Sequence, residues 1–276
     1  MALQKFSKWT RAGVRGSALL NVMIDSAGKA GRNLVRHFHE IESLQVSKKG
    51  PADFVTEADR RAEKILFETL SKARPNYGFL MEESGSISGH DISNRWIIDP
   101  LDGTLNFLHG LPHFAVSIAH ERDGELFTGV IYEPVSDQMF WAERGKGAFL
   151  NGRRIRVSTR QDFSESLFST GIPFKGRENH KPFIRQLEKM MAVSAGVRRF
   201  GAASLDLAYL ATGRYDGFWE QGLSAWDIAA GILIVREAGG IVTDFANRSR
   251  HILEFGEVIA SNGVLHNELQ KLLSQN

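Results

Sequence analysis

Apolar residues recur every three or four positions in the first quarter of the chain, which predicts helices. The pattern over residues 18–44 predicts one long amphipathic helix lying across a sheet. Lys48-Lys49-Gly50-Pro51 breaks this pattern, and a second helix is expected from Thr56, a favourable N-cap residue, to about Leu70. Pro75 and Gly78 mark the next connection.

The hydrophobic period changes to two between residues 96 and 157, and turn residues crowd together there. This pattern predicts strands over residues 96–98, 114–120, 126–132 and 138–142. Asn151-Gly152 favours a two-residue hairpin before an alternating run over 153–157. We therefore expect an antiparallel meander in this part of the chain.

Short strands alternate with helices in the remainder of the chain, which is typical of an α/β arrangement. Strands are expected at 167–169, 197–200, 217–219, 241–243 and 258–260, and helices at 183–191, 203–210, 228–238 and 265–273. Gly239-Gly240 should end the third of these helices. We expect two halves, residues 1–160 with the antiparallel sheet and residues 161–276 with the smaller α/β part, packed rigidly together.

The amino-acid composition limits the classes of protein and of functional site that the chain can form. The 276 residues are 42% hydrophobic and 24% charged, which is typical of a globular protein. The absence of cysteine excludes disulfides, thiolate metal sites and a cysteine nucleophile. A net charge of +2 is weak support for nucleic-acid binding, and no stretch approaches the roughly 20 apolar residues of a membrane span. We expect a soluble, cytoplasmic protein whose basic residues before Asp25 form a solvated lead-in rather than a targeting peptide.

The densest chemical signal lies after the strand predicted at 96–98. Asp99 and Asp102 stand three residues apart, and Pro100 is expected to end the strand there. Neighbouring carboxylates repel unless a cation lies between them, and an oxygen-only set suits Mg²⁺, Mn²⁺ or Ca²⁺. If Gly103 and Thr104 open a helical turn, its free N–H groups make an anion pocket beside the acids. A metal next to an anion pocket suggests a phosphate ester as substrate.

Each acidic motif also has an ordinary structural explanation. The segment 99–104 has the composition of a solvated turn, and Glu82-Glu83 could form an exposed acidic loop. Asp227 could be a helix N-terminal acid favoured by the helix dipole, and Thr56-x-x-Asp59 resembles a capping box. Surface or packing roles are expected for the three histidines that follow the acids, His109, His113 and His120.

Three motifs together resemble the inositol monophosphatase family of Mg²⁺-dependent, lithium-sensitive phosphatases. They are Asp-Pro-Leu-Asp-Gly-Thr at 99–104, Trp-Asp-Ile-Ala-Ala-Gly at 226–231 and Glu-Glu-Ser at 82–84. The resemblance extends from residue 51 to about residue 240, and the segment 105–118 looks most like the bacterial extragenic-suppressor type. It implies a layered αβαβα sandwich, an α/β (α+β) fold of the sugar-phosphatase type.

The resemblance also implies a ligand set for Mg²⁺. Glu82, Asp99 and the carbonyl of Leu101 would bind one ion, and Asp99, Asp102 and Asp227 would bind a second. These ligands fall mostly in the half at 1–160, and the half at 161–276 would close the site. Two such ions would activate a water, neutralise the phosphate and stabilise the leaving alkoxide.

Catalytic and substrate contacts follow from the same resemblance. Thr104 would orient the attacking water, polarised by Asp59, and Glu82 would also contact that water. The amides of Gly103 and Thr104 would hold the phosphate. Contacts with the sugar or inositol ring are implied for Gly201, Ala203 and Glu220, beside Asp102 and Asp227. The chain departs from the family at Met81, where glycine is common, and at Ala202, where many relatives carry a hydroxyl residue. The family's phosphate-side lysine would be Lys48, although a solvated basic pair with Lys49 explains it equally well.

The expected reaction is Mg²⁺-dependent hydrolysis of myo-inositol monophosphate and similar polyol phosphates. The alternatives with the same metal signature are fructose-1,6-bisphosphatase, 3′-phosphoadenosine-5′-phosphate phosphatase and histidinol-phosphatase. The resemblance further implies a homodimer. A non-catalytic role through contacts with the transcription or ribosome machinery stays open, with the basic N-terminus and Arg153, Arg154 and Arg156 as its sequence support.

Overall fold

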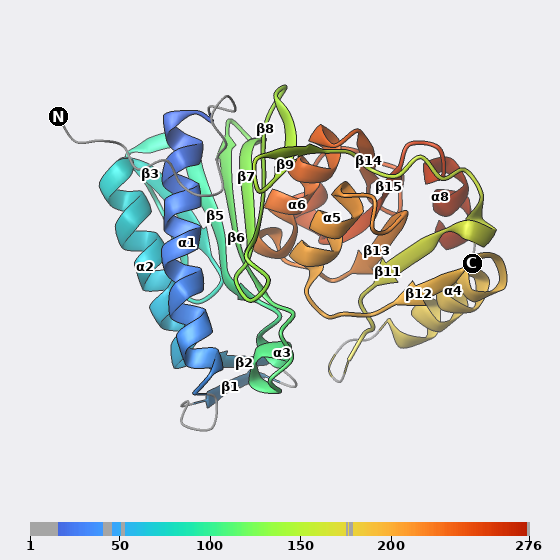
Figure 1. Cartoon of the computed structure of the whole chain (residues 1–276), viewed down its shortest axis with the longest axis horizontal. Helices are drawn as coiled ribbons and strands as arrows, with labels where there is room; N and C mark the ends of the chain where they lie inside the picture. Colours follow the sequence, from blue (N-terminus) through green and yellow to red (C-terminus); the bar gives the residue numbers. More distant parts are fainter. Residues whose placement is uncertain (1–15, 41–45, 51–52, 175, 177–178, 275–276) are drawn as a thin grey trace.

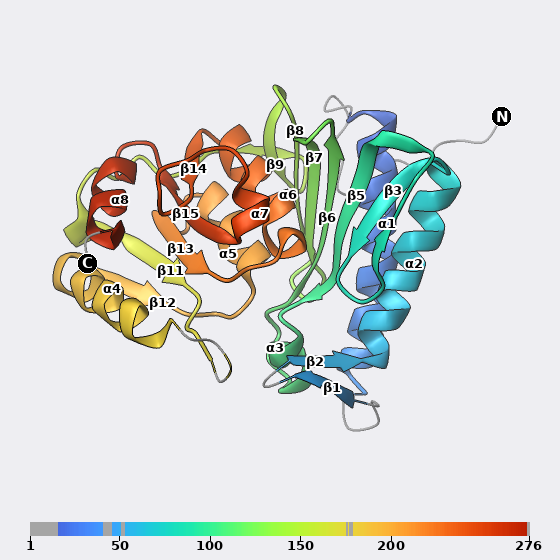
Figure 2. The same cartoon turned by 180° about the vertical axis from the view of Figure 1, so that it is seen from behind.

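A computed structural model of the chain describes residues 16–40, 46–50, 53–174, 176 and 179–274, and for 46–50 and 53–55 it describes the backbone alone. Five layers of helix and sheet follow one another along the long axis (Figures 1 and 2). They are a helix pair, an eight-stranded sheet, a second helix pair, a five-stranded sheet and a third helix pair. The expected layered αβαβα sandwich is therefore confirmed.

The eight-stranded sheet has the strand order β10-β9-β8-β7-β6-β5-β3-β4. Its pairs are antiparallel except for β3 with β5, and the run from β5 to β10 is the meander expected from the sequence. Its strands are β3 (Tyr77–Met81), β4 (Gly85–Ile87), β5 (Asp91–Asp102), β6 (Ala115–Arg122), β7 (Glu125–Glu133), β8 (Gln138–Glu143), β9 (Gly147–Leu150) and β10 (Arg153–Ile155).

Two long helices cover the outer face of this sheet. Helix α1 (Ala18–Phe38) begins at Ser17, whose hydroxyl accepts the N–H of Leu20 at 3.1 Å. It ends earlier than the expected residue 44, and the end of that prediction lies outside the described residues. Helix α2 (Glu57–Ala73) begins at Thr56 with a complete capping box, as its sequence predicts. Both helices direct their apolar stripes into one buried core against the sheet.

The inner helix pair lies in a core that both halves of the chain build. Helices α5 (Ala203–Ala211) and α6 (Ala225–Glu237) pack between the two sheets, and α5 except Tyr209 and the α6 stretch Ile228–Val235 are buried. A helix that is apolar on all sides needs such a position, because it has no face to offer to water. The core around these helices includes residues of the large sheet, so the two halves of the chain share it.

The five-stranded sheet has the order β12-β11-β13-β15-β14. Helices α4 (His180–Val193) and α8 (His266–Ser274) cover its outer face around a third core. The strands are β11 (Leu167–Thr170), β12 (Gly196–Arg198), β13 (Gly217–Gln221), β14 (Gly240–Thr243) and β15 (Glu257–Asn262). Four short elements complete the described fold, namely β1 (Val46–Gly50), β2 (Asp53–Thr56), α3 (Thr104–Leu108) and α7 (Ile252–Phe255), with a 3₁₀ turn at Phe163–Glu165.

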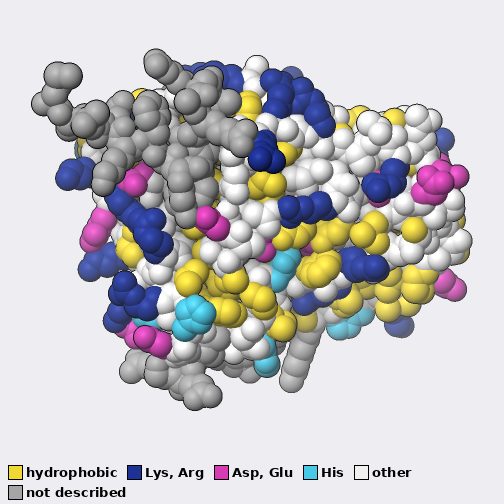
Figure 3. Space-filling view, in the orientation of Figure 1, with side chains coloured by type: hydrophobic (Ala, Val, Ile, Leu, Met, Phe, Trp, Pro, Cys, Tyr) yellow, Lys and Arg dark blue, Asp and Glu magenta, His cyan; other side chains and the backbone are white. Residues whose placement is uncertain are grey.

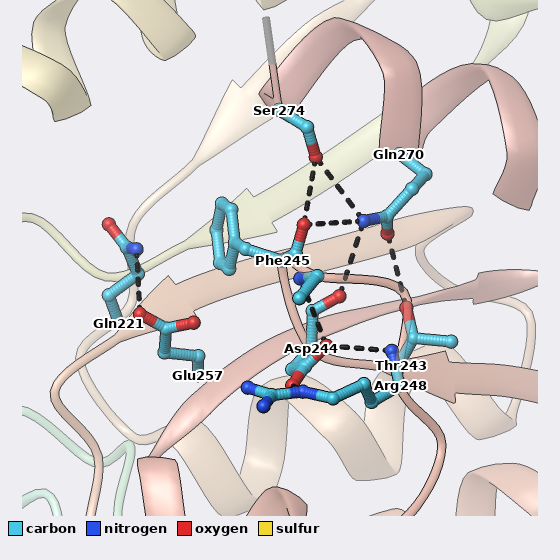
Figure 4. A network of polar contacts seen from close by, with 9 residues as sticks. Gln221, Thr243, Asp244, Phe245, Arg248, Glu257, Gln270 and Ser274 are labelled. Carbon is cyan, nitrogen blue, oxygen red and sulfur yellow. Dashed lines mark hydrogen bonds and ion pairs between the residues drawn. The ribbon is translucent and has the colours of Figure 1, made fainter.

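A polar network fastens the last helix to the second sheet (Figure 4). The buried carboxylate of Asp244 accepts the backbone N–H of Arg248 at 2.7 Å and its guanidinium at 2.5 Å. The side chain of Gln270 on α8 donates to the carbonyls of Asp244 and Phe245. These bonds satisfy polar groups that burial would otherwise leave unpaired, and they hold the loop after β14 against α8.

Candidate active site

The end of β5 carries two of the predicted metal ligands on an irregular stretch of strand. Asp99 pairs with Ser117 of β6 and Asp102 pairs with Ala115, so the β5 side has one extra residue between these pairs. Such a bulge leaves a residue without a ladder hydrogen bond, which is where a proline is tolerated. The expectation that Pro100 ends the strand is therefore wrong, since β5 continues to Asp102.

Four acids from three distant segments meet around Asp99. The side chain of Asp99 is 2% exposed, and its pKa is raised well above the usual range. Burial is the first cause, and the nearby charges of Glu82, Asp102 and Asp227 and a hydrogen bond with Glu82 add to it. The structure thus brings together the acids whose convergence the sequence predicted. Their role as metal ligands stays a prediction.

The donor set of this acid cluster fits a hard divalent cation. Carboxylates buried this closely repel one another unless protons or cations compensate them, and oxygen-only donors suit Mg²⁺. Among the residues that the structure describes, no three His, Asp or Glu side chains already stand arranged to hold a metal ion. Glu82 and Asp99 share a hydrogen bond, and Asp102 is bound by a helix terminus. The acids are therefore assembled side by side, and oxygens of Asp102 and Asp227 accept hydrogen bonds from backbone N–H groups.

Asp102 caps helix α5 from another part of the chain. Its Oδ2 accepts the backbone N–H of Ser204 at 2.8 Å and the Ser204 hydroxyl at 2.5 Å, and the N–H of Ala203 also bonds this carboxylate. Burial raises the pKa of Asp102 to about 6, although these hydrogen bonds pull in the opposite direction. The first turn of α5 has unsatisfied N–H donors and a positive dipole end, so a carboxylate is a favourable partner. This contact fixes the α/β half against the predicted metal site.

The hydroxyl of Thr104 lies between two acceptors. It is 3.2 Å from Oδ1 of Asp59 and 2.9 Å from the carbonyl oxygen of Leu101. The other carboxylate oxygen of Asp59 accepts the N–H of Thr56 at 2.8 Å and its hydroxyl at 2.5 Å. Burial raises the pKa of Asp59, and the bonds from Thr56 and Thr104 oppose that rise. Asp59 therefore serves the capping box and contacts Thr104 at once.

The segment after β5 turns tightly into α3. Gly103 has a φ of 89°, and a Cβ there would lie 3.0 Å from the carbonyl oxygen of His113 and 3.3 Å from Ala202 Cβ. A left-handed backbone with so little space requires glycine. Thr104 then begins α3, so the expected helical turn after the acids is confirmed.

The predicted ring-binding residues lie on the α/β half. Asn106 of α3 donates to the carbonyls of Phe200 at 2.8 Å and Gly201 at 3.4 Å, which ties the loop before α5 to helix α3. Glu220 of β13 is half-buried, and its charge contributes to a raised pKa at Asp206, after burial, as does the charge of Asp102. Gly201 and Ala203 thus lie in the segment that reaches Asp102, and Glu220 and Asp102 both lie near Asp206.

Sequence reasoning missed three polar residues next to this site, Glu63, Ser204 and Asp206, all almost fully buried. Ser204 and Asp206 interrupt an apolar helical run, and a polar residue inside such a run signals a specific partner. Glu63 stands four residues after Asp59, on the same face of α2. Lys48 and the basic residues before residue 16 lie outside the described side chains.

The three histidines behave as the sequence predicted. His120 is buried, contacts Asn94 at 2.8 Å and stacks on Tyr77. His113 is half-buried between Phe200 and Tyr209, and His109 is exposed. Burial lowers the pKa of both His113 and His120 to about 4, so neither carries a charge near neutral pH.

Comparison with known proteins decides the family. The model of the inositol monophosphatase family matches residues 17–276. The chain belongs to this family. It is 56% identical over 259 residues to inositol-1-monophosphatase of Mesorhizobium japonicum, covering 94% of this chain and 97% of that protein. It is 44% identical to Nus factor SuhB of Escherichia coli K12, covering 88% of this chain and 91% of that protein.

The fold agrees with this membership of the inositol monophosphatase family. The crystal structure of the extragenic suppressor protein suhB from Bartonella henselae aligns with a TM-score of 0.92 at 54% identity. The alignment covers 94% of this chain and all of that one. Within the described residues, no helix is long and apolar enough to cross a membrane.

Proposed function

We propose that this inositol monophosphatase family member is a Mg²⁺-dependent phosphomonoesterase acting on myo-inositol monophosphate and related polyol phosphates. The observation that carries the proposal is the convergence of Glu82, Asp102 and Asp227 on the buried Asp99. A relative at 56% identity is named inositol-1-monophosphatase, which supports the substrate class. The phosphatase reaction class follows from the family.

The proposed ligands divide between two ions. Glu82, Asp99 and the Leu101 carbonyl would hold one Mg²⁺, and Asp99, Asp102 and Asp227 would hold the second. Bound Mg²⁺ would supply the positive charge that neutralises the phosphate oxygens and polarises water. Phosphate monoesters hydrolyse extremely slowly unaided, so charge stabilisation in a site shielded from water is the expected source of the rate enhancement.

The protein's own groups would orient the reactants. The Thr104 hydroxyl would accept a hydrogen bond from the attacking water while Asp59, 3.2 Å away, accepts the hydroxyl proton. The N–H groups of Gly103 and Thr104 would hold the phosphate next to the acids. On the ring side, Gly201, Ala203 and Glu220 would meet the vicinal hydroxyls of the substrate.

The proposed substrate and the proposed Mg²⁺ ligands can be tested together by measuring phosphate release. Phosphate release should be measured with inositol 1-phosphate, fructose 1,6-bisphosphate, 3′-phosphoadenosine 5′-phosphate and histidinol phosphate, with and without Mg²⁺. We expect Mg²⁺-dependent turnover of inositol 1-phosphate, inhibited by lithium, and its loss in Asp99→Asn. Turnover of another substrate with silence on inositol 1-phosphate, or undiminished activity of Asp99→Asn at every Mg²⁺ concentration, would refute the assignment.

A second role has a specific observation in its favour. Relatives at 44–47% identity are named Nus factor SuhB. Arg153, Arg154 and Arg156 are exposed at the β9–β10 hairpin and its end, as the sequence predicted for a solvated face. We propose that a contact with the transcription machinery could coexist with catalysis. The Asp227→Asn variant should abolish hydrolysis and leave such a scaffold role intact, whereas loss of both would argue against a separate role.

We also propose that the family's homodimer forms at the free edge of the second sheet. Strand β12 is one of the two edge strands of this sheet. Hydrophobic side chains lie at the surface of this half (Figure 3), and the exposed apolar residues in the segments next to β12 in the sequence are Ile172, Phe174, Ile184, Met191, Val193 and Phe200. A cluster of this kind is typical of an interface with a second copy. Light scattering should give twice the chain mass, and Ile184→Glu should reduce it. A cytoplasmic location stays a prediction.

A further inference from the structure

A buried carboxylate on α2 holds the turn that carries one of the predicted metal ligands. Glu63 is 4% exposed, and its Oε2 accepts the backbone N–H of Glu83 at 2.9 Å. Its Oε1 accepts the hydroxyl of Ser84 at 2.5 Å. Both partners directly follow Glu82 in the three-residue turn between β3 and β4.

This turn faces an open groove on its outer side. Its strands pair at Met81 with Gly85, and the N–H of Glu82 bonds the carbonyl of Ile98 at 3.2 Å. Beyond Glu83 and Ser84 the surface opens into a groove of about 380 Å³, lined also by Arg60, Lys64, Phe67 and Ile87. Packing therefore restrains this side of the turn less than a filled core would. The two hydrogen bonds to Glu63 accordingly contribute more to holding the turn in place.

The position of Glu63 on α2 makes it an effective clamp. Residues four apart lie on the same face of a helix, and Asp59, which contacts Thr104, stands four residues before Glu63. One rigid helix thus holds both Asp59, which contacts the residue proposed to orient the attacking water, and the turn that carries a predicted ligand. Groups that orient metal ligands from outside typically change metal affinity 10- to 100-fold when they are removed.

We propose that Glu63 is a positioning residue, which acts through hydrogen bonds to Glu83 and Ser84 to preset Glu82 for metal binding. The inference rests on the proposed function, because it requires Glu82 to be a ligand. A clamp must act through hydrogen bonds rather than through its charge. The amide of glutamine can make both bonds, because its oxygen accepts the Glu83 N–H and its NH₂ donates to the Ser84 oxygen. The variant Glu63→Gln therefore separates an effect of hydrogen bonding from an effect of charge.

The test compares Glu63→Ala, Glu63→Gln and Ser84→Ala. The matched control is Glu68→Ala, because Glu68 lies on the same helix, is exposed and pairs with Lys64. The Mg²⁺ dissociation constant without substrate is measured by calorimetry, and phosphate release gives kcat at saturating Mg²⁺. We expect about 10-fold weaker binding for Glu63→Ala and about 3-fold for Ser84→Ala. Glu63→Gln and the control should stay within about 2-fold of wild type, and kcat of Glu63→Ala should recover to within about 3-fold.

Several results would overturn the proposal. Unchanged Mg²⁺ affinity in Glu63→Ala, including a case in which its melting temperature falls, would leave Glu63 with a purely structural role. An equal loss in Glu63→Gln would assign the effect to charge. A loss of kcat at saturating Mg²⁺ without any loss of affinity would contradict a clamp on a ligand.

A reference variant keeps this inference distinct from the proposed function. Glu82→Gln should lose Mg²⁺ affinity outright. If it binds Mg²⁺ as the wild type does, Glu82 is not a ligand and the proposed ligand set fails together with the inference. If Glu82→Gln loses affinity while Glu63→Ala does not, the inference alone fails.

Discussion

The double role of Asp59 leads to a prediction that separates helix capping from catalysis. In Asp59→Asn, the new amide can turn its oxygen either toward Thr56, where two donors stand, or toward the single hydroxyl of Thr104. The orientation toward Thr56 satisfies more hydrogen bonds, so the capping box should survive. Thr104 then meets an NH₂ group, loses the Asp59 carboxylate as proton acceptor and keeps only the neutral Leu101 carbonyl.

The magnitudes follow from this geometry. Asp59 is fully buried and its pKa is raised, so removal of its charge also removes a desolvation cost. Asp59→Asn should therefore lose no more than about 1 kcal/mol of unfolding free energy, the scale of one cap. Its kcat should fall about 10²- to 10⁴-fold, as expected when a proton acceptor is removed.

Thr56→Ala should show the opposite pattern. The variant deletes the hydroxyl that caps α2, so unfolding free energy should fall by about 1 kcal/mol. In a chain of this size, that loss should lower the melting temperature by about 2 °C. Its kcat should stay within about 3-fold, because Asp59 Oδ1 and Thr104 are untouched. Urea unfolding and phosphate release at 25 °C measure the two effects.

The control is the cap of another helix. Ser17→Ala removes the hydroxyl that accepts the Leu20 N–H in α1, distant from the site, and should lower only stability. The reasoning would be refuted if Thr56→Ala lost as much kcat as Asp59→Asn. It would equally be refuted if Asp59→Asn kept more than a tenth of the wild-type rate.

Three further predictions concern neighbouring residues. Gly103→Ala should lower unfolding free energy by about 1–2 kcal/mol in urea titrations, because φ is 89° there, and wild-type stability would contradict the strain. Ser204→Ala should raise the Mg²⁺ concentration for half-maximal rate about 10-fold, because the lost hydroxyl bonds Asp102, and Ser204→Thr should recover part of this loss. An unchanged Mg²⁺ requirement would exclude a role of Ser204 in orienting Asp102. Burial lowers the pKa of His266 to about 4, so the unfolded chain binds its proton first as pH falls below about 6.5, and stability is lost from there down to pH 4. From pH 7 to pH 5 the protonation of His266 should lower the unfolding free energy by about 2 kcal/mol. Urea titrations at both pH values should show that His266→Asn loses about 2 kcal/mol less than the wild type over this range.

Much of the element order could be predicted from local patterns. The capping box at Thr56 and Asp59, the hairpin at 151–152 and the helical turn after Gly103 all appear where the residues predicted them. Each depends on interactions within a few residues along the chain, so a short window of sequence contains all the information. The three acidic motifs also identified the segments that build the site, and Asp99 does meet its predicted neighbours.

Other features depend on contacts that no local window contains. Pro100 was expected to end a strand, but the pairing of β5 with β6 places it in a bulge. Asp102 caps α5 about a hundred positions away, and Glu63 binds a turn on another strand pair. Sheet register and helix packing decide such contacts, because they fix which side chains point at one another. The sequence by itself determined the elements and the chemistry they carry. Only the tertiary structure decided which buried donor forms a hydrogen bond with each carboxylate. The reason is that hydrogen bonds act over about 3 Å in space, regardless of separation along the chain.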